Sequence, residues 1–350
     1  MRAVVIESAG GRVGVEERPV PAAPPGGVVV RVLATGLCRS DWHAWAGHDT
    51  DVTFPHVPGH ELAGEVAEVG DGVGGWAVGD RVTAPFVSGC GRCAWCRRGE
   101  AQVCPDQQQP GFTYPGSFAE YVVIHAAALN LVRVPVGVSM PAAASLGCRF
   151  ATAYRGLVAR AGLQEGEWLA VVGAGGVGLS AVMIGRALGA RTVVVDRHQE
   201  ALDAALAHGA RHAVLATPDL TPSDLAERLH ELTDGGAHVA VDAVGDEATA
   251  AASILALRRR GRHVQVGLLP PVDGHPRIPM DRVIGWELDL LGSHGMAAAD
   301  YPELMALVAA GRVRPQDLVE RTIGLAEAAV VLPTFDSARL GGITIIDPTR

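Results

Sequence analysis

Four cysteines lie close together in one segment of this chain. Cys90, Cys93, Cys96 and Cys104 have the spacing C-x2-C-x2-C-x7-C. Thiols spaced this closely can surround one ion, but they cannot readily pair as unstrained disulfides. Four thiolates fill the tetrahedral shell of zinc and leave no open position, so the spacing predicts a closed, structural zinc site. The alternative is four free cysteines in a loop.

Length and charge limit the class of protein. The chain has 350 residues, more than one ordinary domain holds and a length that suits two. Its net charge of -9 argues against a nucleic-acid-binding surface. The densest basic run, Arg258 to Arg262, follows an expected helix, and cations interact favourably with a helix C-terminus.

No membrane partner is expected either. Glu7 interrupts the apolar N-terminus too early for a signal peptide, and glycines divide the uncharged stretch 168–185 into a strand and a helix start. We therefore expect a cytoplasmic protein. Thiols stay reduced in the cytoplasm, which favours metal binding over disulfides for the cysteines.

Hydrophobic patterning divides the chain into two kinds of segment. The first part shows short alternating runs typical of an irregular β domain, at 28–33, 62–69 and 81–84. From Phe150 onward, buried strands alternate with amphipathic helices. Strands are expected at 168–172, 192–195, 213–215, 238–242, 263–266 and 288–291, and helices at 199–208 and 222–232, the second capped by Thr221.

This order predicts an α/β protein with a doubly wound parallel sheet. The tail, with a helix at 301–310 and a strand at 343–346, is expected to return to the first domain. The predicted domains are 1–149 together with 293–350, and 150–292.

A glycine-rich turn follows the strand at 168–172. Its sequence matches G-x-G-x-x-G and opens a helix, and Asp196 lies at the end of the next strand. In such a turn the backbone approaches a pyrophosphate, which the helix N-terminus binds. Asp196 is placed to bond a ribose diol and to repel a 2′-phosphate, which favours NAD over NADP, although the adjacent Arg197 could pair with that phosphate. The turn residues are Gly173, Gly175, Gly176, Val177 and Gly178.

Two more cysteines and a histidine are dispersed along the chain. Cys38 and Cys148 are each followed by an arginine, and His60 lies in a Gly-His-Glu segment. Two thiols and a histidine suit an open, catalytic zinc site. Spacing alone makes them only candidates, because a lone Cys or His is more often part of a buried core.

These motifs together resemble the zinc-dependent alcohol dehydrogenases of the medium-chain dehydrogenase/reductase superfamily. The resemblance covers nearly the whole chain and rests on the segment Cys38–His43, the Gly-His-Glu segment, the four-cysteine lobe, Cys148 and the glycine turn. It implies a GroES-like catalytic domain and a Rossmann coenzyme domain. It also implies that Cys38, His60 and Cys148 bind a catalytic zinc, which is the Cys2His set known for this family.

The resemblance further implies catalytic roles for four residues. Glu61 would lie close behind the zinc, and Asp41 would orient His60 through its second ring nitrogen. Ser40 would contact the alcohol oxygen and pass its proton toward His43 through the nicotinamide ribose. Alternatively, Ser40 caps a helix that begins at Asp41, and His43 is a surface imidazole.

The same family resemblance implies contacts to the cofactor and to the substrate. Arg39 would contact the cofactor pyrophosphate, and Thr152 would pack near the nicotinamide. Phe86, Leu268 and Trp42 would line the substrate pocket, with Leu268 also beside the cofactor, although core packing is an alternative for all three. His48 and His56 are not expected to be ligands.

The predicted activity is reversible hydride transfer between a zinc-bound alcohol, or the corresponding aldehyde or ketone, and NAD(P). Two zinc ions per chain and a homo-oligomer, tetramer or dimer, are expected. One alternative is a polyol or sugar dehydrogenase of the same superfamily; these often replace a ligand cysteine by a carboxylate, so Cys148 argues against it. Another is a non-catalytic binding protein on the same scaffold. A zinc-free reductase would lack both metal sites.

One segment departs from the family pattern. Many bacterial relatives carry an arginine near the C-terminus, in a Gly-Arg-Ile-type segment that helps to bind the cofactor phosphate. Here the segment reads Gly341-Gly342-Ile343, and Arg339 is out of register. A weaker or differently arranged grip on the cofactor is therefore expected.

Overall fold

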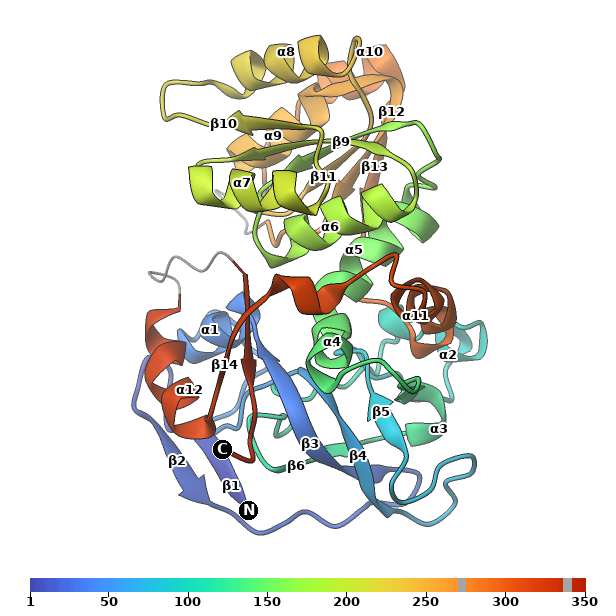
Figure 1. Ribbon diagram of the computed structural model, residues 1–350, viewed down its shortest axis with the longest axis vertical. Helices are drawn as coiled ribbons and strands as arrows, with labels where there is room; N and C mark the ends of the chain where they lie inside the picture. The colour runs from blue at the N-terminus through green and yellow to red at the C-terminus, as the bar shows by residue number, and fades with distance from the viewer. Residues whose placement is uncertain (270–274, 336–341) are drawn as a thin grey trace. The chain divides into compact units, whose positions relative to one another are not determined.

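The computed structural model describes residues 1–269, 275–335 and 342–350, which form two compact units (Figure 1). The first unit comprises Met1–Ala151 and Gly295–Arg350, and the second comprises Thr152–His294. The predicted domain boundaries lie two residues before each of these joins. Within the described ranges, no helix is both long enough and apolar enough to cross a bilayer.

The second unit is built on a parallel sheet. Its strands pair in the order β10-β9-β8-β11-β12-β13, and every pair is parallel. Counted from β8, this is the order 3-2-1-4-5-6 of the doubly wound dinucleotide-binding fold, which confirms the predicted Rossmann class. The strands are β8 (Trp168–Val172), β9 (Arg191–Asp196), β10 (His212–Leu215), β11 (Ala237–Asp242), β12 (Leu257–Gln265) and β13 (Asp289–Gly292).

Helices connect these strands. The predicted cap of α8 is confirmed, because the Thr221 hydroxyl accepts the Asp224 N–H at 3.2 Å and the Asp224 carboxylate accepts the Thr221 N–H at 2.9 Å. The helices are α5 (Ala151–Arg155), which spans the join between the units, α6 (Gly176–Ala187), α7 (Gln199–His208), α8 (Pro222–Leu232), α9 (Glu247–Leu255) and α10 (Met280–Trp286).

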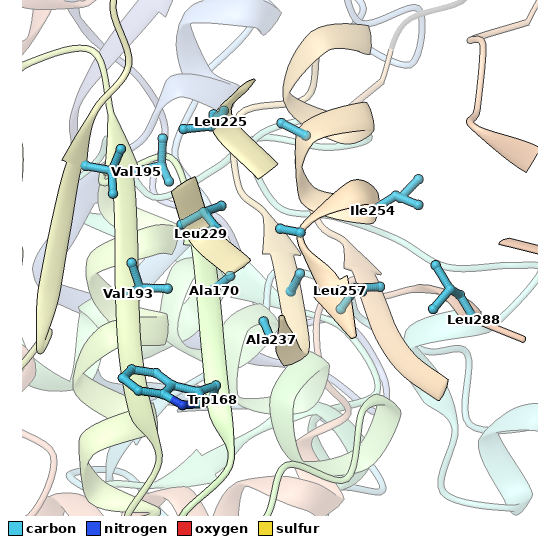
Figure 2. Packing of buried hydrophobic residues seen from close by; sticks show 14 residues of the cluster. Trp168, Ala170, Val193, Val195, Leu225, Leu229, Ala237, Ile254, Leu257 and Leu288 are labelled. Atoms are coloured by element: carbon cyan, nitrogen blue, oxygen red, sulfur yellow. The ribbon is translucent and has the colours of Figure 1, made fainter. Parts of the chain in front are cut away.

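A buried cluster fixes α8 and α9 on one face of this sheet. Alternate residues of β8, among them Trp168 and Ala170, point to that face, because side chains along a strand alternate between faces. Figure 2 shows Leu225 and Leu229 of α8 directed onto the strands beside them. Burying each such side chain contributes about 1.5–3 kcal/mol, so the cluster holds the helices on the sheet whose strand ends carry the glycine turn.

Strand β12 differs from its prediction. The strand was expected only over 263–266, with the arginine run at a helix end, but it begins at Leu257 and contains that run. Leu257 and Gly261 are buried, whereas the arginines face outward and bond to neighbouring groups, as Arg260 does to Glu287 and Arg262 to Glu167. β12 lies between β11 and β13, and its register with β11 shifts between Leu257 and Arg262, so the arginine run lies in a bulge of this strand.

The first unit is built on a mostly antiparallel sheet, in which only the β14–β15 pair is parallel among the described strands. Seven strands form this sheet in the order β14-β15-β3-β4-β5-β7, with β6 paired to β3, and β1 and β2 form a separate hairpin. The strands are β1 (Arg2–Ile6), β2 (Val13–Glu17), β3 (Val28–Leu37), β4 (Glu61–Val69), β5 (Arg81–Thr83), β6 (Tyr121–Ile124), β7 (Val132–Arg133), β14 (Val319–Ile323) and β15 (Ile343–Ile346).

The C-terminal tail completes this unit. Strand β15 pairs antiparallel with β3 and parallel with β14, so this part of the tail lies in the sheet of the first unit. The helices of the unit are short, and along the chain they alternate with its strands. They are α1 (Arg39–Trp45), α2 (Ala94–Arg97), α3 (Ala127–Asn130), α4 (Met140–Ser145), α11 (Tyr301–Ala309) and α12 (Leu325–Val331).

The register of β3 and β4 positions the candidate site. Gly36 pairs with Glu61, and Thr35 pairs with Leu62. Cys38 follows the end of β3 and His60 precedes the start of β4, so the antiparallel pairing brings these two residues to one end of the sheet. Cys148 reaches the same place from a π-helical turn, Leu146–Phe150, an irregularity that is frequent at functional sites.

Candidate active site and metal centres

Four side chains far apart in sequence converge at that end of the sheet. The ligand atoms of Cys38, His60, Glu61 and Cys148 all lie within 4.8 Å of one another. Three of these residues are buried, and Cys148 is half-buried. The structure therefore brings together all three predicted ligands of the catalytic zinc, with the predicted carboxylate beside them.

Asp41 holds this cluster in position. Its Oδ1 accepts from His60 Nδ1 at 3.0 Å and from the Gly59 N–H at 3.2 Å, and its Oδ2 accepts from the Cys38 N–H at 2.8 Å. Burial lowers the pKa of His60, but attraction to Asp41, the hydrogen bond to it and the contact with Cys38 together outweigh burial and raise the pKa well above its ordinary value. In the neutral ring, the bond to Asp41 places the hydrogen on Nδ1 and the lone pair on Nε2.

The donor atoms fit a metal ion. His60 Nε2 is buried without a hydrogen-bond partner among the residues that the structure describes, an arrangement that costs free energy unless another group fills the gap. Hydrogen bonding to Cys148 holds the pKa of Cys38 well below its usual value, while the same contact and burial raise the pKa of Cys148. A divalent cation between the sulfurs would make both of them thiolates, and two thiolates with one imidazole suit zinc.

Glu61 binds Arg149, a residue that was not predicted to have a role. Arg149 Nε donates to Glu61 Oε1 at 2.9 Å and to Oε2 at 3.1 Å, and Nη2 donates to Oε2 and to the Leu37 carbonyl. Both side chains are buried. A Cβ at Gly36 would collide with Glu61 Oε2 and lie 2.9 Å from Arg149 Nη2, so glycine in β3 makes room for this pair. Burial raises the pKa of Glu61, and the guanidinium opposes that shift.

Helix α1 carries the predicted proton-transfer residues. It begins at Arg39 with Cys38 as its cap residue, so the alternative that Ser40 caps a helix starting at Asp41 is wrong. Ser40 Oγ lies 3.8 Å from Cys38 Sγ. His43 follows Ser40 by three residues and so projects from the same face of the helix. His43 is half-buried and contacts His48, which sequence reasoning set aside.

The remaining predicted contacts differ in burial. Phe86 is 8% exposed, and its ring centroid lies 6.0 Å from that of His60; Phe112, which the sequence did not suggest, lies 5.0 Å from His60. Trp42 packs partly into the core beside β1 and β3. Leu268 is 73% exposed, so core packing is wrong for this residue.

Two further predicted cofactor contacts differ in exposure. Arg39 is exposed on α1. Thr152 is buried, and its carbonyl accepts from the Ser293 hydroxyl at 3.4 Å. Arg339 and Gly341, in the segment that departs from the family pattern, lie outside the described residues.

The glycine turn lies at the C-terminal end of β8. Gly175 is the cap residue of α6, and a Cβ at Gly178 would overlap the Gly173 carbonyl oxygen, so only glycine allows this close approach. Asp196 ends β9, and its carboxylate accepts from the Ala174 N–H at 2.7 Å and from the His198 N–H at 2.9 Å. Arg197 donates to His198 at 3.1 Å. β8 and β11 are neighbours where the strand order reverses, the usual dinucleotide site of this fold.

The four-cysteine lobe forms a second convergent cluster. The sulfur atoms of Cys90, Cys93, Cys96 and Cys104 lie within 4.8 Å of one another, and all four thiols are free. Cys93 Sγ accepts the Cys96 N–H and Cys104 Sγ accepts the Cys90 N–H, each at 3.4 Å. Backbone N–H groups lower the pKa of Cys90 to about 6, whereas burial raises that of Cys104 to about 12. Four converging sulfurs with N–H donors fit a closed tetrathiolate zinc.

Comparison with known proteins agrees with this geometry. A family model for the alcohol dehydrogenase GroES-like domain matches residues 24–136, and one for zinc-binding dehydrogenases matches residues 176–310. The chain is 32% identical to an NAD-dependent alcohol dehydrogenase of Sulfurisphaera tokodaii, covering 99% of this chain and 100% of the relative. It is also 32% identical to a sorbitol dehydrogenase of Halalkalibacterium halodurans, covering 93% and 94% of the two chains.

A solved structure has the same fold over the full length. An alcohol dehydrogenase from Thermus sp. ATN1 superimposes with a TM-score of 0.89 at 31% identity, covering 99% of both chains. Together with the two family models, these full-length similarities establish the family. The chain belongs to the zinc-dependent alcohol dehydrogenases of the medium-chain dehydrogenase/reductase superfamily, and it is an NAD(P)-linked oxidoreductase that acts on CH–OH groups.

Proposed function

We propose that this enzyme oxidises small alcohols with NAD, reversibly, at a zinc ion held by Cys38, His60 and Cys148. The observation that carries the proposal is the convergence of these three donors around a buried His60 Nε2 that the described residues leave unpaired. When bound, zinc supplies a Lewis acid that favours the deprotonated alcohol, and the nicotinamide supplies the hydride acceptor. Cys90, Cys93, Cys96 and Cys104 would hold a second, structural zinc.

The residues of α1 would prepare the alcohol for reaction. Asp41 fixes the orientation of His60. The buried ion pair between Glu61 and Arg149 lies beside the ligands. Ser40 would accept the hydrogen bond of the alcohol hydroxyl, and His43 would take the proton as general base. Phe86 and Phe112, whose rings lie against His60, would exclude water from the site. Trp42 and Leu268 are weaker candidates for the pocket.

The glycine turn would bind the cofactor pyrophosphate, with Arg39, Thr152 and Leu268 as further contacts.

Replacing Gly178 by alanine is expected to destabilise the second unit by about 1–3 kcal/mol, because the new Cβ overlaps the Gly173 carbonyl oxygen. Thermal unfolding of the cofactor-free protein measures this effect. The matched variant is Gly175→Ala, since a Cβ there has no neighbour within 4 Å. It should fold and instead weaken NADH binding; equal melting losses in both variants would contradict the assignment.

Asp196 would select NAD over NADP. Its carboxylate would bond the ribose diol, and an Asp196→Asn variant should lower kcat/KM with NAD about 10- to 100-fold, because a hydrogen bond to a charged group is worth about 1.5–3 kcal/mol. The same change removes the charge that repels a 2′-phosphate, so kcat/KM with NADP should rise. Asp203→Asn, an exposed change on α7, serves as the control. An unchanged ratio of the two cofactors would exclude this role.

A second candidate substrate class is polyols, which the similarity to a sorbitol dehydrogenase favours. Cys148 as third ligand supports simple alcohols instead. A spectrophotometric screen of primary, secondary, aromatic and polyol substrates with NAD and NADP distinguishes the two. Highest kcat/KM for sorbitol or a related polyol would replace the first candidate by the second.

We also propose that the enzyme is a cytoplasmic homo-oligomer, a dimer or tetramer. Six free cysteines suit a reducing compartment. The edge strand β13 and helix α10 expose Met280, Ile284 and Leu290, apolar side chains that a second copy would cover. Sedimentation of the purified protein gives its oligomeric state.

A further inference from the structure

Helix α1 ends in a turn that brings His48 back beside His43. Gly47 has a φ of +79°, and its N–H donates to the Ala44 carbonyl at 3.2 Å. The His48 N–H donates to the His43 carbonyl at 3.0 Å. These are the two bonds of a Schellman motif, in which the residues at the positions of His43 and His48 commonly touch. That contact is usually hydrophobic, but here it joins two imidazoles.

The two rings are bonded to each other and held by a third. His43 Nδ1 lies 2.9 Å from His48 Nδ1. The Trp42 ring contacts both, with centroids 5.0 Å from His43 and 5.5 Å from His48, each in an edge-on arrangement. Trp42 is itself packed against the core. Asp41, the carboxylate on the same helix, is bonded instead to His60 and to backbone N–H groups.

The bond between the imidazoles has a consequence for His43. One Nδ1 must carry the hydrogen and the other must accept it. If His48 accepts, His43 Nδ1 carries the hydrogen and His43 Nε2 is unprotonated, which is the form that a general base needs. In the opposite arrangement His43 Nε2 carries the hydrogen and cannot accept a proton. Only the first arrangement suits the role proposed for His43.

The solvent exposure of the side chains increases from Cys38 to His48. Cys38 is 8% exposed, Ser40 and His43 are half-buried, and His48 is exposed. His48 therefore contacts water at the far end of the series, where a released proton has to leave.

We propose that His48 is the outer residue of the proton path, resting on the proposed function of Ser40 and His43. His48 Nδ1 holds His43 in the Nδ1–H form. As His43 Nε2 gains the proton from the alcohol side, the Nδ1–H proton of His43 passes to His48 Nδ1. His48 then releases its Nε2 proton to water. One proton leaves the alcohol and one enters solvent, and His43 then carries its hydrogen on Nε2 and His48 on Nδ1. The starting forms return when water takes the proton from His43 Nε2 and gives one to His48 Nε2, with the shared hydrogen passing back to His43 Nδ1.

The form of His43 can be observed without cofactor or substrate. Nitrogen NMR of protein labelled with 15N-histidine, assigned with His43 and His48 variants, should show His43 as the Nδ1–H form. In His48→Phe this signal should move toward the Nε2–H form, because the accepting nitrogen is gone. In His48→Gln it should stay, since the side-chain carbonyl still accepts a hydrogen bond.

Transient kinetics separates positioning from proton passage. The burst of NADH formation should slow about 5- to 10-fold in both His48→Phe and His48→Gln, with unchanged KM for NAD. Added imidazole should restore the burst in His48→Ala. His208→Gln, on α7 of the other unit, is the control and should behave as wild type.

The outcomes distinguish the inference from the function on which it rests. If His43→Ala slows the burst while the His48 variants keep both the wild-type burst and the wild-type His43 signal, the role of His48 is excluded and the base remains. If His43→Ala also leaves the burst unchanged, the proposed roles of Ser40 and His43 fail first.

Discussion

A Cys38→Ser variant is expected to fold and to lose alcohol oxidation by roughly 1,000-fold or more. The serine hydroxyl is a much weaker zinc ligand than the cysteine thiolate. Without the zinc ion, the reaction loses a Lewis acid that lowers its barrier by several kcal/mol. The fold should persist, because the Cys38 N–H bond to Asp41 uses the backbone and is kept. Initial rates with a small alcohol and NAD measure the loss, and circular dichroism checks the fold. Retained turnover would contradict the assignment of the catalytic ligands.

The same chemical change in the four-cysteine lobe should have the opposite result. Cys93→Ser removes one of four ligands from a closed site that has no role in the reaction, so the expected effect is lower stability of the lobe and loss of its metal. Residual activity per folded molecule should remain measurable. A Cys93→Ser variant that melts like wild type would remove the structural zinc from the account.

An Arg149→Met variant is expected to lose about 3–5 kcal/mol of stability. The change leaves the fully buried Glu61 carboxyl group without its guanidinium partner, and breaking one side of a buried ion pair costs this much. Urea unfolding followed by tryptophan fluorescence measures the shift. The double variant Glu61→Gln/Arg149→Met removes both charges and should recover most of the loss.

Arg31→Met provides the matched control for this result. Arg31 pairs with Glu65 on the same two strands, β3 and β4, but its side chain is 48% exposed. Exposed pairs contribute at most about 1 kcal/mol, so this variant should unfold near the wild-type midpoint. Equal losses for Arg31 and Arg149, or no recovery in the double variant, would show that Arg149 does not act through Glu61.

Local patterns accounted for what could be predicted from the sequence. The helices 199–208 and 222–232 match the structure because each has a helical period and a cap or turn at its end. The strand 168–172 matches because it is a continuous apolar run that ends at the glycine turn. The four-cysteine cluster was predictable because its ligands lie in one short segment. Cys38, His60 and Cys148 needed the family resemblance, since nothing in a sequence states which distant strand ends meet.

Arg149 and His48 were missed for different physical reasons. The role of Arg149 depends on the register that sets Gly36 opposite Glu61, and register is a tertiary property. His48 follows His43 by five residues, which on a continuing helix would place it about 140° around the axis. Gly47 instead ends the helix in a left-handed turn, which brings His48 back beside His43. A glycine just beyond the end of the helix was the one available signal.

The most direct test of the account is the zinc content of the wild-type protein and of a His60→Ala variant, measured by elemental analysis after gel filtration. Two ligand clusters predict two zinc ions per wild-type chain. The His60→Ala variant should keep only the ion of the four-cysteine lobe, because its first cluster loses the imidazole nitrogen that faces the thiols. One zinc ion in the wild type, or two retained in His60→Ala, would contradict the catalytic centre described above.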